Sequence, residues 1–187
     1  RRQRQMCIRD RWAPIDLYET AKSAMQELTA PAELKNVSIQ LEGKKTVIQG
    51  IPQLVSGIVF NLMDNAVKYN KDGGLVIVRL GEEKGQAVLT VTDTGIGISP
   101  EHQERVFERF YRVDKSRSKA TGGTGLGLAI VKHIVAQHGA KLTLESEQGK
   151  GTEIRVEFSE ALKQHELETA KQRQEAHAER SENGSSD

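Results

Sequence analysis

Apolar positions recur along the chain with two different periods, one helical and one of strand type. Helical spacing runs from Leu17 to Leu28 and from Ile51 to Asn70, which places the apolar side chains on one face of each helix. A third helix is predicted from Gly125 to His138, where apolar residues occupy most of the circumference and indicate burial. Asp16 is suited to cap the first helix, and Gly139 stands where the third should end.

Strand-type alternation predicts three pairs of strands between and after these helices. The strands are expected at 37–41 and 46–49, at 75–80 and 87–92, and at 141–146 and 152–158. A short turn separates the members of each pair, so we expect three hairpins. Hairpins that alternate with helices indicate an α+β or α/β sandwich, with one sheet covered on one face by helices.

The composition changes at both ends of the chain. Residues 1–11 carry five arginines and are interpreted as a basic leader or the truncated end of an upstream region. Residues 12–159 form the predicted folded domain, and residues 160–187 a polar tail that is helical or disordered. No run of about 18 apolar residues occurs, so no membrane-spanning segment is predicted.

Charge and cysteine content exclude several classes of protein. The chain has 27 lysines and arginines against 26 aspartates and glutamates, which argues against binding of nucleic acid through overall charge. Its single cysteine, Cys7, excludes a disulfide framework. Glycine is slightly enriched, with 17 residues, and the arrangement of these glycines is more informative than their number.

The second predicted helix has a polar face beside its apolar stripe. Asn61, Asn65 and Lys68 share one face at i, i+4 and i+7. The separate apolar stripe is made by Val55, Val59, Leu62 and Ala66. Amide oxygens suit Mg²⁺, and a lysine can meet phosphate as a point charge. A solvated helix face would explain the same pattern.

A carboxylate ends an inward-facing row in the strand around residue 90. Alternation puts Leu89, Val91 and Asp93 on the apolar face, where an unpaired carboxylate would be costly. Either Asp93 accepts hydrogen bonds from the N–H groups of Gly95 or Ile96 in a local turn, or it accepts one from a ligand amino group at the floor of a pocket.

A second glycine cluster, at residues 122–128, leads directly into the third helix. Glycines let backbone N–H groups approach a ligand closely, and a helix N-terminus offers unpaired donors that bind phosphate. The sequence of this cluster matches neither the Walker phosphate-binding loop nor the dinucleotide-binding motif. A flexible connector before a helix is the alternative.

Together these segments resemble the motifs of sensor histidine kinases. Residues 61–70 are similar to their asparagine box, 93–98 to the first glycine box, 105–112 to the phenylalanine box and 122–128 to the second glycine box. The resemblance extends over residues 12–158. It implies the Bergerat fold of the ATP-binding catalytic domain, shared with gyrase, heat-shock protein 90 and mismatch-repair ATPases. That fold is an α+β two-layer sandwich with a mixed, mostly antiparallel sheet covered by three helices.

The resemblance also implies ATP and Mg²⁺ as cofactors and assigns roles to side chains. Asn65, assisted by Asn61, would hold Mg²⁺, and Lys68 would contact phosphate. Tyr69 would pack on the adenine, and Asp93 would accept a hydrogen bond from the adenine amino group. Further nucleotide contacts are implied for Gly95, Gly97, Ile98, Gly123, Thr124, Gly125, Leu126, Gly127 and Leu128.

A lid over ATP is implied for residues 99–123. Phe107 and Phe110 would anchor it, and Arg112 or Lys115 would reach the γ-phosphate. In hydrolysing relatives of this fold, a glutamate four residues before the magnesium asparagine activates water. Asn61 occupies that position here and cannot act as a base, so hydrolysis is expected to be slow.

The implied reaction is transfer of the γ-phosphoryl group to a histidine on a separate dimerisation domain, which this chain lacks. Only His165-Glu166-Leu167 has a superficial likeness to the acceptor sequence. A response regulator would be an indirect partner, and the chain would be the cytoplasmic domain of a membrane-anchored bacterial sensor. An anti-sigma-type serine kinase and a non-catalytic ATP-binding module are the alternatives on the same fold.

Overall fold

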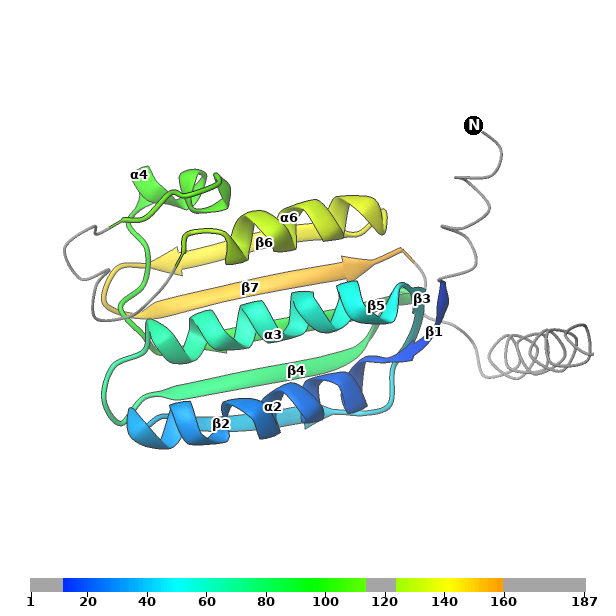
Figure 1. Ribbon diagram of the computed structural model, residues 1–187, viewed down its shortest axis with the longest axis horizontal. Helices are drawn as coiled ribbons and strands as arrows, with labels where there is room; N and C mark the ends of the chain where they lie inside the picture. Colours follow the sequence, from blue (N-terminus) through cyan, green and yellow to red (C-terminus); the bar gives the residue numbers. More distant parts are fainter. Residues whose placement is uncertain (1–11, 114–123, 160–187) are drawn as a thin grey trace, which may run out of the picture.

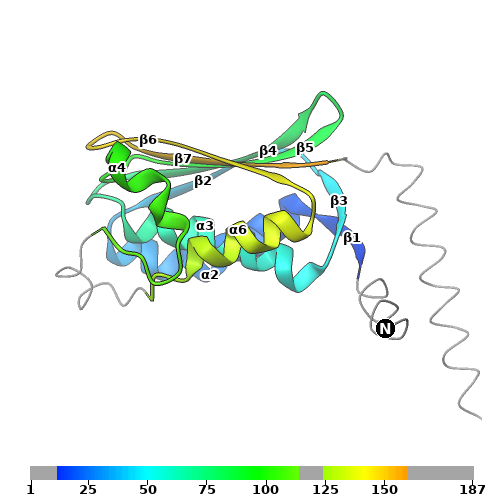
Figure 2. The same cartoon turned by 90° about the horizontal axis from the view of Figure 1, so that it is seen from above.

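Three helices cover one face of a five-stranded sheet in the computed structural model, which describes residues 12–113 and 124–159 (Figure 1). The helices are α2 (Leu17–Leu34), α3 (Pro52–Lys68) and α6 (Gly127–Gln137). The strands, in spatial order, are β2 (Ser38–Gly43), β4 (Leu75–Glu83), β5 (Gln86–Asp93), β7 (Gly151–Phe158) and β6 (Lys141–Glu147). Seen edge-on, the sheet and the helices form two separate layers (Figure 2). The expected two-layer sandwich is therefore confirmed.

Helix α3 lies between α2 and α6 and forms the centre of the helical layer (Figure 1). Pro52 occupies its first turn, where the missing N–H costs little. Its predicted apolar stripe, Val55, Val59, Leu62 and Ala66, is buried as expected. The stripe packs toward the inner face of the sheet, which leaves the opposite face of α3 for polar residues.

The first predicted hairpin is wrong. β2 and β3 (Val47–Gly50) do not pair with each other. β2 instead pairs in parallel with β4, and β3 pairs antiparallel with β1 (Ala13–Asp16), a strand that the sequence pattern did not predict. The parallel register sets Ile39 beside Val76 and Leu41 beside Val78, so that these apolar side chains share the inner face. The other two predicted hairpins, β4–β5 and β6–β7, are confirmed.

Two predicted helices differ from the structure. Helix α2 continues to Leu34 through Pro31, because Ala32 extends its buried face and the proline stands on the exposed side. Helix α6 is not buried around its circumference: Val131, Ile134 and Val135 are buried, whereas other positions such as Ile130 face solvent. Asp16 and Gly139 cap their helices as predicted.

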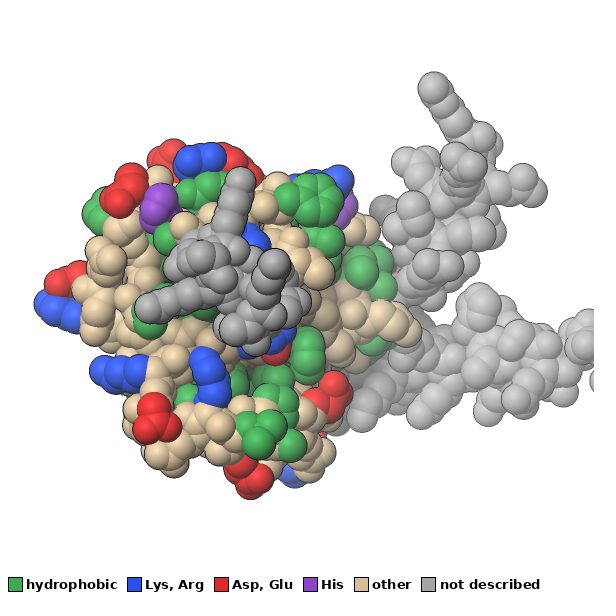
Figure 3. All heavy atoms as spheres, turned by 60° about the vertical axis from the view of Figure 1, so that its left-hand side comes forward, with side chains coloured by type: hydrophobic (Ala, Val, Ile, Leu, Met, Phe, Trp, Pro, Cys, Tyr) green, Lys and Arg blue, Asp and Glu red, His purple; other side chains and the backbone are tan. Residues whose placement is uncertain are grey.

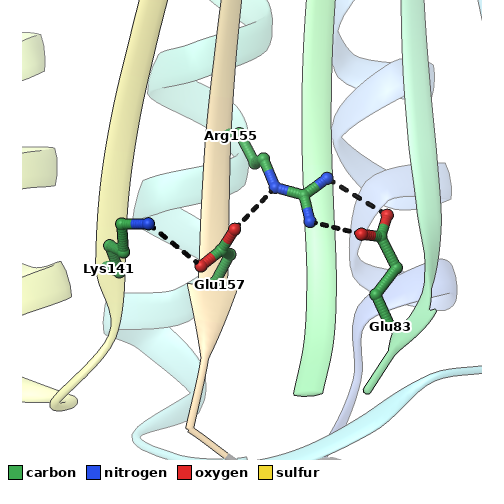
Figure 4. A network of polar contacts seen from close by, with 4 residues as sticks. All are labelled: Glu83, Lys141, Arg155 and Glu157. Carbon is green, nitrogen blue, oxygen red and sulfur yellow. Dashed lines mark hydrogen bonds and ion pairs between the residues drawn. The ribbon is translucent and has the colours of Figure 1, made fainter. Parts of the chain in front are cut away.

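The face of the sheet that the helices leave open carries a network of charges (Figure 4). Arg155 donates two hydrogen bonds to Glu83, at 3.1 and 2.6 Å, and one to Glu157 at 2.8 Å. Lys141 pairs with Glu157 at 3.6 Å. The guanidinium of Arg155 lowers the pKa of Glu83 and of Glu157. These four side chains thus link β4, β7 and β6 across the open face of the sheet.

His138 ties three parts of the domain together at the end of the sandwich where β1 and β3 lie. Its Nε2 accepts a hydrogen bond from the Ile51 N–H at 3.1 Å, and its Nδ1 donates to the Ile134 carbonyl at 2.9 Å. The Trp12 ring lies 5.0 Å from the imidazole. Both ring nitrogens of this buried side chain are therefore occupied, in the tautomer with the proton on Nδ1.

We expect His138→Phe to lower the free energy of unfolding by about 1–3 kcal/mol, because it leaves the buried Ile51 N–H without an acceptor. Urea titration of the two proteins measures the difference. The control is His133→Phe, at an exposed position of α6, the helix that His138 caps. It should change stability by less than about 0.5 kcal/mol. Equal losses in the two variants would contradict this role of His138.

Candidate functional site

The end of α3, the end of β5 and the beginning of α6 meet at one end of the sandwich, opposite β1 and β3 (Figure 1). A backbone hydrogen bond of 3.1 Å joins the Ile96 N–H, just after β5, to the carbonyl of Tyr69, just after α3. A Cβ placed on Gly127, the first residue of α6, would lie 2.9 Å from Oδ1 of Asn61 in α3. The three predicted motifs are thus brought together at this end.

The polar face of α3 is directed toward the beginning of α6. The Nδ2 of Asn61 donates to the Gly57 carbonyl at 2.7 Å, which leaves its Oδ1 facing Gly127. The amide Nδ2 of Asn65 lies 3.5 Å from the same Cβ position. Among the described residues, no hydrogen bond occupies the Asn65 side chain. Its amide is therefore available to a ligand.

Lys68 is part of an ion pair in this structure. Its Nζ lies 2.6 Å from Oδ2 of Asp64, one turn earlier on α3. The lysine side chain is 39% exposed and the aspartate 19%, so the ammonium group can also reach solvent. For Lys68 to contact phosphate as predicted, its ammonium must either leave the Asp64 carboxylate or lie between that carboxylate and the phosphate.

The hydrogen bonding of Asp93 confirms the local turn, which is one of the two interpretations that its sequence pattern left open. Its Oδ1 accepts a hydrogen bond from the Gly95 N–H at 2.8 Å, as in the local turn. Burial nevertheless raises the pKa of its carboxyl from 3.8 to about 6, against the opposing effect of the Gly95 and Thr152 backbone N–H groups. Burial thus disfavours the charged form of this carboxyl more than the two N–H donors favour it. Asp93 stands at the end of the buried row of Leu89 and Val91, as predicted.

This pKa gives Asp93 a defined effect on stability. Because the folded state favours the protonated carboxyl, the contribution of Asp93 to the free energy of unfolding is fully present below pH about 4 and is lost as the pH rises to about 6. We expect wild type to lose stability relative to Asp93→Asn across this interval, and the difference to be constant above it. Urea unfolding of both proteins at stepped pH measures it, and a difference independent of pH would contradict the raised pKa.

The first glycine box passes between two backbone segments. A Cβ on Gly95 would lie 2.3 Å from the Tyr69 carbonyl oxygen, so only glycine allows this approach. Gly97 has a positive φ of 64° and lies against Glu147. Tyr69 is 40% exposed beside this loop, which leaves its ring free to pack on a planar ligand.

Two residues that the sequence analysis missed hold the glycine box in place. Ser146 Oγ accepts a hydrogen bond from the Ile98 N–H at 2.8 Å. Gln103 donates from Nε2 to the carbonyls of Ile98, at 3.0 Å, and of Ser146, at 2.8 Å. Ser146 follows Leu142 and Leu144 on the inward-facing side of its strand. A polar residue in that row was the available signal, as it was for Asp93.

The second glycine box leads into the open N-terminus of α6. Leu126 is the N-cap, and no side chain caps the helix, so its first N–H groups remain available for an anion. Thr124 is exposed, whereas Gly125 and Leu128 are partly buried. Gly122 and Gly123 lie outside the described residues. The predicted phosphate contacts of this box stay predictions.

The expectation that both phenylalanines anchor the lid is wrong for Phe110, whose side chain is 71% exposed. Only its backbone is held, because its N–H donates to the Gly125 carbonyl at 2.9 Å. Phe107 is partly buried, with Nζ of Lys132 lying 5.8 Å from its ring centre. Arg112 is partly buried and has a protein partner. Lys115 lies outside the described residues.

The described residues at this end of the molecule present acidic and basic side chains interspersed (Figure 3). Within 12–113 and 124–159, no group of three or more histidine, cysteine or carboxylate side chains could hold a metal ion. On α3, the amides of Asn61 and Asn65 face the start of α6, and the nearby carboxylate of Asp64 is paired with Lys68. This fits Mg²⁺, which is commonly bound through few protein ligands together with substrate phosphates.

Residues 50–162 match the family described as Histidine kinase-, DNA gyrase B-, and HSP90-like ATPase. The chain belongs to this family. Within it, the chain is a catalytic ATP-binding domain of the sensor histidine kinase type. The phosphate regulon sensor protein PhoR of Pseudomonas aeruginosa is 40% identical over 149 residues, which are 79% of this chain and 34% of PhoR.

Other histidine kinases show the same relationship. The sensor histidine kinase RppB of Synechocystis is 41% identical over 143 residues, covering 76% of this chain and 31% of RppB. The solved mycobacterial histidine kinase MprB is 31% identical with a TM-score of 0.69, over 79% of this chain and 96% of that structure. The structure of full-length ShkA in complex with AMPPNP is 28% identical, with a TM-score of 0.71, over 81% of this chain and 32% of ShkA. This chain thus spans about a third of the curated kinases that it matches.

No described helix is both long and apolar enough to cross a membrane.

Proposed function

We propose that this histidine kinase domain binds Mg-ATP and transfers the γ-phosphoryl group to a histidine of a separate dimerisation and phosphoacceptor domain. The observation that carries the proposal is the meeting of the α3 amides with the uncapped start of α6, where Gly127 leaves room beside Asn61. Amide oxygens that lie beside unpaired helix N–H groups suit a chain of phosphates bound with a metal ion.

The adenosine would be held at the other side of the same end. The partly buried carboxylate of Asp93 would accept a hydrogen bond from the adenine amino group. The exposed Tyr69 would pack on the base, and Gly95 keeps the first glycine box close to the backbone of Tyr69. With these contacts the base would lie next to β5 and the phosphates next to the start of α6.

Asn65, with Asn61 beside it, would hold Mg²⁺, because their amide oxygens are hard, neutral donors. The ion would neutralise charge on the phosphate oxygens during transfer. The N–H groups at the start of α6 and the Lys68 ammonium would stabilise the remaining charge. The protein thus contributes positioning and electrostatic stabilisation, which is what phosphoryl transfer requires.

Transfer to another nucleophile is favoured over hydrolysis by the chemistry of α3. Asn61 stands where the hydrolysing relatives carry a basic glutamate, and its amide already donates to the Gly57 carbonyl. The neighbouring carboxylate of Asp64 is paired with Lys68. Neither side chain is therefore free to activate a water molecule, and the γ-phosphoryl group is preserved for an acceptor.

The test combines this chain with a histidine-bearing dimerisation domain and ATP labelled in the γ-phosphate. We expect Mg-dependent labelling of the acceptor that is lost in acid, as phosphohistidine is. The chain alone should bind ATP without labelling itself. Acid-stable label on serine would support the alternative serine kinase, and ATP binding without transfer would support a non-catalytic module. Either result would overturn the proposal.

The wider signalling context is part of the same proposal. A phosphohistidine on the dimerisation domain would donate its phosphoryl group to a response regulator, which would be an indirect partner of this domain. Relatives such as PhoR are named as sensor proteins, and we propose that this domain serves a membrane-anchored sensor from the cytoplasmic side.

A further inference from the structure

Lys35, the C-cap of α2, makes its contacts on another helix. Its Nζ donates to the carbonyl oxygens of Val67 and Asn70, each at 3.3 Å, and also to that of Lys68. The last carbonyls of a helix have no partners within it and carry partial negative charge. The ammonium of Lys35 therefore satisfies the end of α3 and not the end of its own helix.

The same short segment of α3 is held from the other side by the first glycine box. The Ile96 N–H donates to the carbonyl of Tyr69 at 3.1 Å, and Gly95 packs against that carbonyl and against Cα of Asn70. The segment from Lys68 to Asn70 thus lies between the Lys35 ammonium and the glycine box. Lys68 and Tyr69, two residues that the proposed function assigns to the nucleotide, belong to this segment.

We propose that Lys35 is a positioning residue for the nucleotide: it fixes the end of α3 so that Lys68 and Tyr69 are held against the first glycine box. Partial burial lowers the pKa of its ammonium, which fits a group that has exchanged water for protein carbonyls. The inference rests on the proposed function, because it needs a nucleotide at this site. It assigns part of that site to α2, which contributes no side chain to the predicted motifs.

The test is Lys35→Met in the full chain, which keeps the length of the side chain and removes its charge. We expect binding of both ATP and ADP to weaken about tenfold in calorimetry, since several charge-assisted hydrogen bonds are lost. Lys35→Arg, which can still donate to the carbonyls, should restore most of the affinity. Hydrogen exchange should accelerate at the Ile96 amide in Lys35→Met, with or without nucleotide.

Ala21→Gly is the matched control, since it weakens the same helix at a buried position of its first half. It should lower the unfolding midpoint without changing nucleotide affinity or exchange at Ile96. Equal losses of affinity in Ala21→Gly and Lys35→Met would show that Lys35 only stabilises the fold, and would overturn the inference. Unchanged binding by Lys35→Met would also overturn it. Failure of the wild-type chain to bind ATP would instead contradict the proposed function.

Discussion

Replacing Asp93 with asparagine should weaken ATP binding by on the order of 100-fold, which corresponds to about 2.7 kcal/mol. The carboxylate is partly buried, its Oδ1 accepts a hydrogen bond from the Gly95 N–H, and the proposed function makes a ligand amino group its further partner. An amide in the same place brings a donor toward the adenine amino group and loses the charge-assisted hydrogen bond. Calorimetric titration with ATP at pH 7 measures the change.

Base selectivity provides a sharper readout of the same substitution. Guanine carries a carbonyl oxygen where adenine carries its amino group, so wild type should reject GTP and Asp93→Asn should narrow the difference between the two nucleotides. Glu145→Gln, on the open face of the sheet, removes a comparable charge away from the site and should leave both affinities unchanged. A selectivity for ATP that survives in Asp93→Asn would show that the adenine is recognised elsewhere.

Changing Asn65 to alanine should reduce phosphoryl transfer at least about 100-fold, because an electrostatic contact to the transferred group is typically worth that much or more. The loss follows from the removal of the amide that is free for a ligand. Nucleotide affinity in the presence of chelator should change little, since Asp93 and Tyr69 are untouched. Transfer of γ-label to an added histidine domain, together with calorimetry with and without Mg²⁺, separates these effects.

Gln53→Ala is the matched control, an exposed amide on the first turn of the same helix. It should retain full transfer activity. If Asn65→Ala transferred phosphate at the wild-type rate, its assignment to Mg²⁺ would be wrong. If its affinity fell equally with chelator and with Mg²⁺, the side chain would contact the nucleotide directly and not through the metal.

The sequence predicted the position of a candidate site residue where that position depends on a single helix or strand. The row that ends at Asp93 and the polar face with Asn61 and Asn65 need only the period of a strand or a helix. Lys35 and Gln103 gave no such signal, because their partners are backbone carbonyls that only the tertiary fold brings to them. A lysine at the end of a helix looks like a residue that interacts with its own helix dipole, and only the tertiary arrangement of α2 and α3 shows otherwise.

The errors in the predicted fold share a physical cause. The turn around Gly43 suggested a local hairpin, but burial of Ile39 and Leu41 is decided by a strand that lies more than 30 residues further along the chain. Strand β1 has only four residues and pairs with the distant β3, so no local alternation identified it. The extent of burial of α6 depends on its place in the helical layer, which its own composition could not specify.

The parallel pair β2–β4 has a consequence for how the chain folds. Parallel neighbours require a crossover connection, and here the connection contains α3. Strand β2 can therefore join the edge of the sheet only when α3 has packed across it. Such non-local pairing is slow, because the entropy of loop closure is lost before the new contacts stabilise the chain. We expect substitutions in the buried stripe of α3, such as Leu62→Ala, to slow refolding as well as lower stability. Substitutions on its polar face should leave the refolding rate unchanged, so that activity and folding can be altered separately on one helix.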